Sequence, residues 1–176
     1  MPTPIPLALP TPTPLHFLRY ILSRTELPSS SESPQKHNGT DTKTILIVCS
    51  LRQTFLHDLA SSSVDDPSSA PLLNSLVSTS LETLVVSTHV TLVFTPTIQH
   101  LRGYLASLPP QSFTARQQRI PQILAIWGLV EAHAETTEYS AQGIGRTVAA
   151  AVAAGVKTGR WVIVGGLQGS RGNGYG

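Results

Sequence analysis

The strongest constraint in this sequence is a stretch near its end that predicts a strand, a helix and a second strand in succession. Residues 123–130 form a nearly continuous apolar run after Pro121, which is typical of a strand buried on both faces. Ser140 can cap the following helix and Gly159 can end it in a left-handed conformation, before a second apolar strand at 161–164. Because a strand, a crossover helix and a strand pack right-handedly with parallel strands, the stretch predicts an α/β fold.

The helix predicted at 140–158 has one face that we expect to be buried. Ile144, Val148 and Val152 recur every fourth residue, with alanines between them. A stripe of this period points toward the sheet, and it places Arg146 on the outer, solvated face.

The rest of the chain alternates strand and helix patterns in the same way. Thr13 and Pro14 open a short helix that we expect to dock on the core, and Thr95 and Pro96 open another. Strands are predicted at 44–49 and 89–94, and helices at 15–22, after Ser50, at 71–87 and at 96–108. In the helix after Ser50 we expect Phe55, Leu56 and Leu59 to face the sheet. In the helix at 96–108 we expect Ile98, Leu101, Leu105 and Leu108 to be buried. This rhythm predicts a three-layer α/β domain with a mainly parallel sheet flanked by helices.

Composition divides the chain into three parts. Residues 1–43 form a Pro/Ser-rich N-terminal segment, extended at first, with one short helix and a disordered linker. Residues 44–164 form the α/β domain, and residues 165–176 a Gly-rich flexible tail. We expect no secretory signal, because prolines interrupt the N-terminus, and no membrane span, because no apolar run reaches about 18 residues.

The single cysteine and the low charge content limit the class of protein. Cys49 stands alone, which excludes disulfide scaffolds and cysteine zinc sites and favours a reducing intracellular compartment. Only 12% of the residues are charged, so few surface charges oppose association with other proteins. This composition favours a protein that is part of a complex. The net charge of +2 neither demands nor excludes nucleic acid.

Nucleotide-binding motifs are missing where an α/β fold would carry them. The turn after the first predicted strand reads CSLRQTF, with no glycine and no lysine to hold phosphates, and Arg52 there reads as a solvated helix-start residue. The strand at 123–130 ends without an acidic residue for magnesium. The nearby group of Glu131, His133, Glu135 and Glu138 matches no zinc spacing, so we interpret it as a solvated acidic loop.

The remaining motifs also favour structural roles. Gly143 and Gly145 make only a weak dinucleotide pattern, and a GxSxG nucleophile motif is absent. Trp127 and Trp161 lie in predicted strands and are expected in the core. We therefore predict no catalytic, cofactor-binding or metal-binding residue, and no cofactor.

The order of these elements resembles the RecA-like recombinase fold over residues 44–164. The strand at 44–49 stands where the family's phosphate-binding loop would follow, and the buried strand at 123–130 comes later in the chain. After it, Tyr139, Ser140, Ala141 and Gln142 resemble the family's entry into a long helix, which is followed by a valine-rich strand. Since both nucleotide motifs are missing, the resemblance implies a degenerate member. Such members are the non-catalytic recombinase paralogues, for example Shu-complex subunits, and the ATPase-like subunits of Elongator.

The resemblance implies a function through association. The leading hypothesis is a non-catalytic, nuclear RecA-like subunit, hetero-oligomeric with other RecA-like subunits, in homologous recombination and DNA repair, with indirect or weak DNA association at most. The second is an Elongator-type subunit in tRNA modification. The third, of another class, is a small α/β enzyme of unrecognised type, which would have a pocket at the carboxyl ends of the strands.

Overall fold

The computed structural model of the chain describes residues 7–9, 13–25, 44–65, 85, 87–110, 122–134 and 136–166. Most of the helix predicted at 71–87, the linker and the tail from residue 167 lie outside these described residues. Within them, no helix combines the length and the hydropathy needed to cross a membrane.

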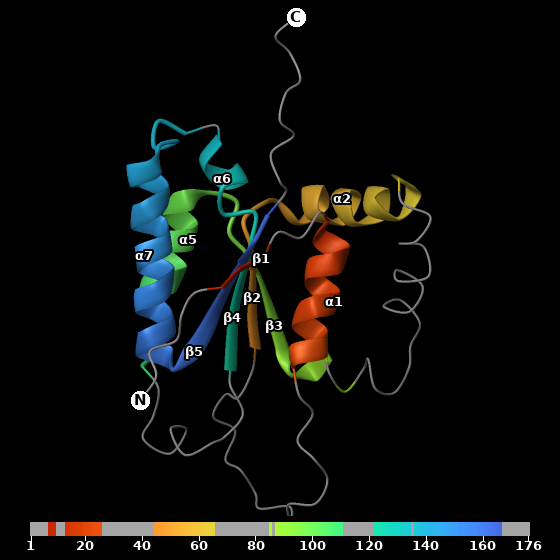
Figure 1. Ribbon diagram of the computed structural model, residues 1–176, viewed down its shortest axis with the longest axis horizontal. Helices are drawn as coiled ribbons and strands as arrows, with labels where there is room; N and C mark the ends of the chain where they lie inside the picture. The colour runs from red at the N-terminus through yellow and green to blue at the C-terminus, as the bar shows by residue number, and fades with distance from the viewer. Residues whose placement is uncertain are drawn as a thin grey trace, which may run out of the picture.

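A single parallel sheet organises the fold (Figure 1). All neighbouring strands pair in parallel, including the pair formed by residues 123 and 161, which confirms the predicted α/β class. The order is β1-β5-β4-β2-β3, so the direction of winding reverses between β2 and β4. The strands are β1 (Leu7–Leu9), β2 (Thr44–Val48), β3 (Val90–Phe94), β4 (Gln122–Trp127) and β5 (Arg160–Gly165).

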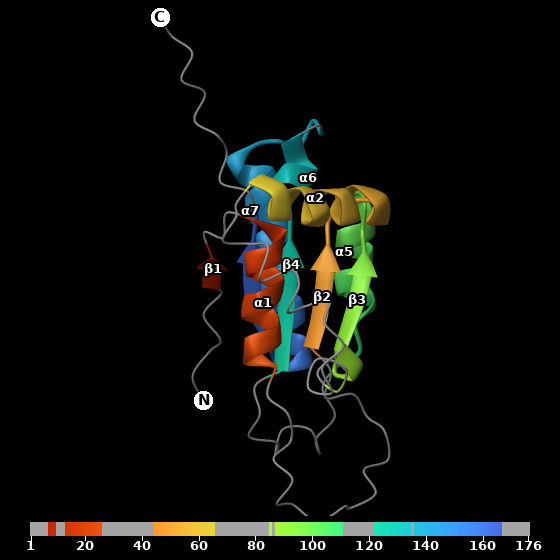
Figure 2. The same cartoon turned by 90° about the vertical axis from the view of Figure 1, so that its right-hand side faces the viewer.

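Helices cover both faces of the sheet and so make the three layers (Figures 1 and 2). One face carries α1 (Pro14–Arg24), and the opposite face carries α5 (Ile98–Ser107) and α7 (Ala141–Thr158). Two further helices, α2 (Arg52–Asp65) and the short α6 (Glu131–Ala134), lie at the end of the sheet where the strands finish.

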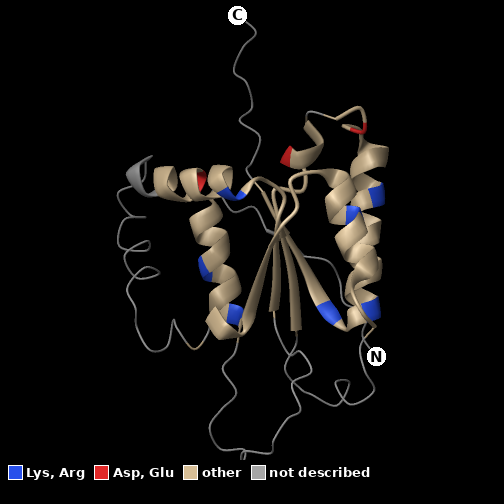
Figure 3. Ribbon diagram, turned by 180° about the vertical axis from the view of Figure 1, so that it is seen from behind, with Lys and Arg blue, Asp and Glu red and all other residues tan. Residues whose placement is uncertain are grey.

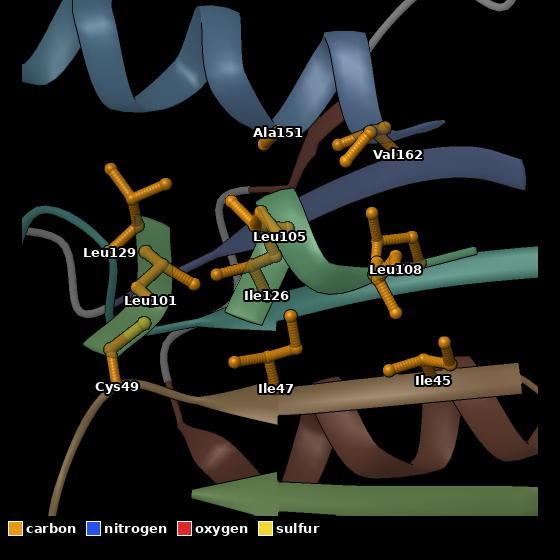
Figure 4. Close-up of a cluster of buried hydrophobic side chains, with 12 residues drawn as sticks. Ile45, Ile47, Cys49, Leu101, Leu105, Leu108, Ile126, Leu129, Ala151 and Val162 are labelled. Atoms are coloured by element: carbon orange, nitrogen blue, oxygen red, sulfur yellow. The ribbon is translucent and has the colours of Figure 1, made fainter. Parts of the chain in front are cut away.

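Each face of the sheet has its own hydrophobic cluster, because alternate residues of a strand point to opposite faces. The cluster under α5 and α7 takes Ile45 and Ile47 from β2, with Leu101 and Leu105 from α5 (Figure 4). The cluster under α1 combines its Phe17 and Ile21 with strand residues Leu46, Val48, Ile123, Ala125, Trp127 and Ile163 and with Phe55 of α2. The predicted docking of the first helix is therefore confirmed.

Side-chain caps fix the ends of three helices. Thr13, Thr97 and Ser140 each accept a hydrogen bond from the backbone amide three residues later, which satisfies an otherwise free donor. Gly159 ends α7 with φ 66°, as predicted. Two predicted caps are wrong: Thr95 is a buried residue after β3, and the Ser50 hydroxyl donates to the Leu51 carbonyl instead.

The buried face of α7 differs from the predicted one. Ile144 and Val148 are only partly buried against the core, whereas the fully packed face consists of small residues. A Cβ at Gly155 would collide with the Val162 side chain, so α7 approaches the sheet too closely for larger residues. The buried residues of α7 are Gly143, Thr147, Ala151, Ala154, Gly155 and Thr158.

Three other differences concern single positions. Trp161 is 58% exposed although it lies in β5 between the buried residues Arg160 and Val162. Leu56 is exposed because α2 lies across the end of the sheet and buries only Phe55 deeply. The short strand β1 was not predicted, since prolines surround its three residues.

The packing of α7 predicts the effect of two matched substitutions. Ala151→Asp should unfold the protein, because an unpaired charge in the core costs several kcal/mol against a typical stability of about 5 to 15 kcal/mol. Ala149→Asp, on the exposed side of the same helix, should lose only about 0.7 kcal/mol of helix propensity. Chemical denaturation measures both, and equal losses would mean that α7 faces another way.

Candidate functional site

The carboxyl edge of the sheet is the natural place for a site in this topology. Ligands of open parallel sheets bind beyond the carboxyl ends of the strands where the winding reverses, which here lies between β2 and β4. Cys49 follows β2, Gly128 follows β4 and Gly166 follows β5. Helices α2 and α6 lie over this edge (Figure 2).

A tight turn after β4 returns the chain to this edge. Gly128 has φ 75°, a conformation that favours glycine, and its amide donates to the Gly165 carbonyl at 2.9 Å. The Gly128 carbonyl in turn accepts from the Ala132 amide at 3.0 Å, in the first turn of α6. The turn therefore places Glu131 directly above the strand ends.

The carboxylate of Glu131 is buried among glycines. Both oxygens are buried, and neither has a hydrogen-bond partner among the residues that the structure describes. A Cβ at Gly166 would lie 2.7 Å from Oε1 and 2.8 Å from Oε2, so any side chain there would displace the carboxylate. A Cβ at Gly128 would lie 3.9 Å from both Oε2 and the Cβ of Cys49. The carboxylate therefore lies beside the ends of β4 and β5.

Cys49 is a protonated thiol in this environment. Burial raises its pKa to about 12, the hydrogen bond from the Thr95 hydroxyl lowers it, and the charge of Glu131 raises it. The Thr95 Oγ1 to Cys49 Sγ distance is 3.8 Å. Since a thiolate is the nucleophilic form, Cys49 is unsuited to covalent catalysis at neutral pH.

A second polar cluster braces α5, α6 and α7. The Arg102 guanidinium donates to both Glu138 oxygens, at 3.2 and 2.6 Å, and to Thr147 Oγ1 through Nε and Nη2. His133 is fully buried, and its Nε2 lies 3.0 Å from Thr147 Oγ1. The prediction of a solvated acidic loop is wrong here, because α6 turns His133 inward and Arg102 draws Glu138 against the helices.

The acidic residues and the histidine that the sequence analysis considered as a group lie in different parts of the structure. Glu131 lies at the sheet edge, His133 and Glu138 belong to the brace, and Glu135 is outside the described residues. In the described part of the chain, no three His, Cys, Asp or Glu side chains are grouped so as to hold a metal. Arg52 is exposed as the first residue of α2, which confirms its predicted role.

Gly143 and Gly145, which the sequence analysis considered as a weak dinucleotide pattern, do not form a phosphate-binding loop. Gly143 is required because a Cβ would collide with the Glu138 carbonyl, and the space beside Gly145 is open. A pocket of about 240 Å³ lies between α5 and α7, lined by Leu105, Ala150 and Ala154 among others, and not at the carboxyl edge. Two glycines in the sequence could have indicated the position of Glu131. Gly128 lies three residues before it, and Gly166 follows the next strand.

The missing partner of Glu131 predicts a stabilising substitution. Glu131→Gln keeps the shape of the side chain and removes a buried, unpaired charge, so the free energy of unfolding should rise by on the order of 1 kcal/mol. Chemical denaturation at neutral pH measures the change, and a loss of stability would show that the carboxylate has a partner within the protein.

Glu138→Gln is the matched control and should have the opposite sign. The hydrogen bond from Arg102 lowers the pKa of Glu138. The pair therefore stabilises the fold above the ordinary pKa of a glutamate, and the contribution is lost as the pH falls through the lowered value. The variant should be less stable than the parent at neutral pH and equal to it in strong acid.

Comparison with known proteins places this architecture in one family. No curated protein and no solved structure matches the chain. A family model with the description SPAC22G7.03-like matches residues 17–169, a range that runs from α1 past the end of β5 and includes Glu131 and Arg102. The chain therefore belongs to the SPAC22G7.03-like family.

Proposed function

We propose that this protein is a non-catalytic RecA-like subunit that acts by association with other RecA-like subunits, in homologous recombination and DNA repair in the nucleus. The observation that carries the non-catalytic part is the chemistry of the carboxyl edge. A phosphate site needs a glycine-rich loop and a cation, whereas here Glu131 places a negative charge beyond β4 and β5. Phosphates would be repelled by that charge, most strongly in a buried position.

The same edge supports a role in association because it presents apolar side chains to solvent. Leu51, between β2 and α2, is 61% exposed, and Val130, between β4 and α6, is 45% exposed. Leu56 on α2 is 49% exposed. Exposed apolar residues grouped at one end of a domain favour a protein partner over a solvated surface.

Two alternatives stay open to the same experiments. An Elongator-type subunit in tRNA modification would use the same kind of association with a different partner. A small α/β enzyme is favoured by one observation, the carboxylate of Glu131 at the position where such folds bind ligands. The protonated thiol of Cys49 makes a cysteine nucleophile unsuitable in such an enzyme.

Affinity purification of the tagged protein followed by mass spectrometry tests the association. We expect RecA-like recombination proteins in the eluate; Elongator subunits would instead support the second alternative. The double variant Leu51→Asp, Val130→Asp should lose these partners, because it charges the exposed apolar edge. Val156→Asp, equally exposed but on α7, is the matched control and should retain them.

Calorimetry with ATP and magnesium tests the non-catalytic part. We expect no saturable heat up to millimolar ATP, because the described residues at this edge include a carboxylate and no lysine. Micromolar affinity would contradict the proposal and favour the enzyme alternative.

A further inference from the structure

The groove of about 240 Å³ between α5 and α7 is an apolar surface that the fold leaves open. Leu105 and Ala154 line it and are buried. Ala106 of α5 and Ala153 of α7 also line it and are exposed, so the groove is accessible from solvent. Side chains of a partner that filled this groove would remove apolar surface from water, which favours association.

The side of α7 that borders the groove has a regular pattern. Arg146, Ala150, Ala153 and Lys157 follow one another at intervals of four, three and four residues, so they lie along one side of the helix. The two alanines leave the space beside them open, because their side chains are single methyl groups. Since a helix rises about 1.5 Å per residue, the two cations stand about 16 Å apart, one at each end of the alanine pair.

The positive charges around the groove are not balanced by α5 and α7 themselves. These helices contain Arg102, Arg146 and Lys157 and no acidic residue (Figure 3). Arg102 is paired with Glu138, but the ion pairs among the described residues do not involve Arg146 or Lys157. The Lys157 Nζ donates to the Ala106 carbonyl at 3.1 Å, which uses one of its three N–H donors. The rim of the groove can therefore pair with carboxylates.

The combination of an apolar floor and a positive rim favours an acidic amphipathic helix. Such a helix lays its apolar side chains into a groove at intervals of three and four residues, as Ala150 and Ala153 are spaced on α7. Single-stranded nucleic acid binds largely by stacking on aromatic side chains, and the described residues that line the groove include no aromatic one. A fatty acid has a single carboxylate and would leave one of the two cations of α7 unpaired.

We propose that the groove between α5 and α7 binds an acidic amphipathic helix of a protein partner. Its apolar side chains pack on Leu105, Ala150 and Ala153, and its carboxylates pair with Arg146 and Lys157. The apolar contacts supply most of the affinity, and the exposed charge pairs orient the helix. The proposal goes beyond the proposed function, because Leu51 and Val130 of the carboxyl edge are not among the residues that line the groove.

The test uses a designed peptide with an uncharged counterpart. The probe is an alanine-rich peptide of about 18 residues, long enough to form a helix in water. It carries two glutamates eleven positions apart, to match Arg146 and Lys157, and leucines four and seven positions after the first glutamate. Fluorescence anisotropy with the full-length protein should give saturable binding at a Kd on the order of 0.1 mM. Binding should weaken as salt is added, and the glutamine counterpart should bind at least tenfold more weakly.

Charge reversal on α7 provides a stricter test. The double variant Arg146→Glu, Lys157→Glu should lose the glutamate peptide and bind a lysine counterpart of it at a similar Kd. The matched control is Arg19→Glu, Arg24→Glu, which makes the same change of net charge at exposed positions of α1, on the opposite face of the sheet (Figure 1). This control should bind the glutamate peptide as the parent does.

A second pair of variants tests the groove without changing the charge. Ala153→Trp should fill the groove and weaken binding of the glutamate peptide at least tenfold. Ala149→Trp places the same side chain at an exposed position of α7 that does not line the groove, and it should leave binding unchanged. Chemical denaturation should show that both variants are folded, since both positions are exposed.

Several results would overturn the proposal. Equal binding of the glutamate and glutamine peptides would show that the cations are not used, and full binding by Ala153→Trp would place the peptide elsewhere. A dimer of the parent in sedimentation velocity that the double variant abolishes would assign the groove to a second copy of the chain. Tight binding of a single-stranded oligonucleotide that the double variant loses would assign the cations to phosphates.

Discussion

The burial of β4 is the constraint on which the rest of the structure depends. Its six residues are all buried, because β2 and β5 pair with its two edges and helices cover both faces. The chain turns at the end of this strand, where Gly128 has φ 75°. The direction of the turn then fixes α6, which places Glu131 over the strand ends and His133 in the interior.

The parts of the fold that could be predicted are those governed by local chemistry. Runs of β-branched and apolar residues identified four parallel strands, and Ser140 and Gly159 marked the ends of α7 through a hydroxyl acceptor and a left-handed glycine. The buried face of α7 could not be predicted, because the prediction relied on large apolar residues, whereas the face against the sheet consists of small ones. Only small residues such as Gly155 allow the helix to lie so close to Val162.

The candidate site was harder to predict because it depends on tertiary position. A glutamate just after a strand is normally solvated, and nothing local to Glu131 indicates that Gly166, from the next strand, lies against its carboxylate. Likewise Glu138 became a structural residue only because Arg102, on a separate helix, reaches it. Trp161 is the opposite case: its residue type favours the core, but its side chain is 58% exposed, although Arg160 beside it in β5 is buried.

The two carboxylates after β4 illustrate how the same residue type acquires different roles. Glu138 forms a bidentate pair with Arg102 that joins α5 to the segment before α7, so its charge contributes to the fold. Glu131 is buried without such a pair in the described residues, and its charge also disfavours ionisation of Cys49. Real proteins commonly break such local rules at functional sites and compensate for the cost elsewhere in the structure.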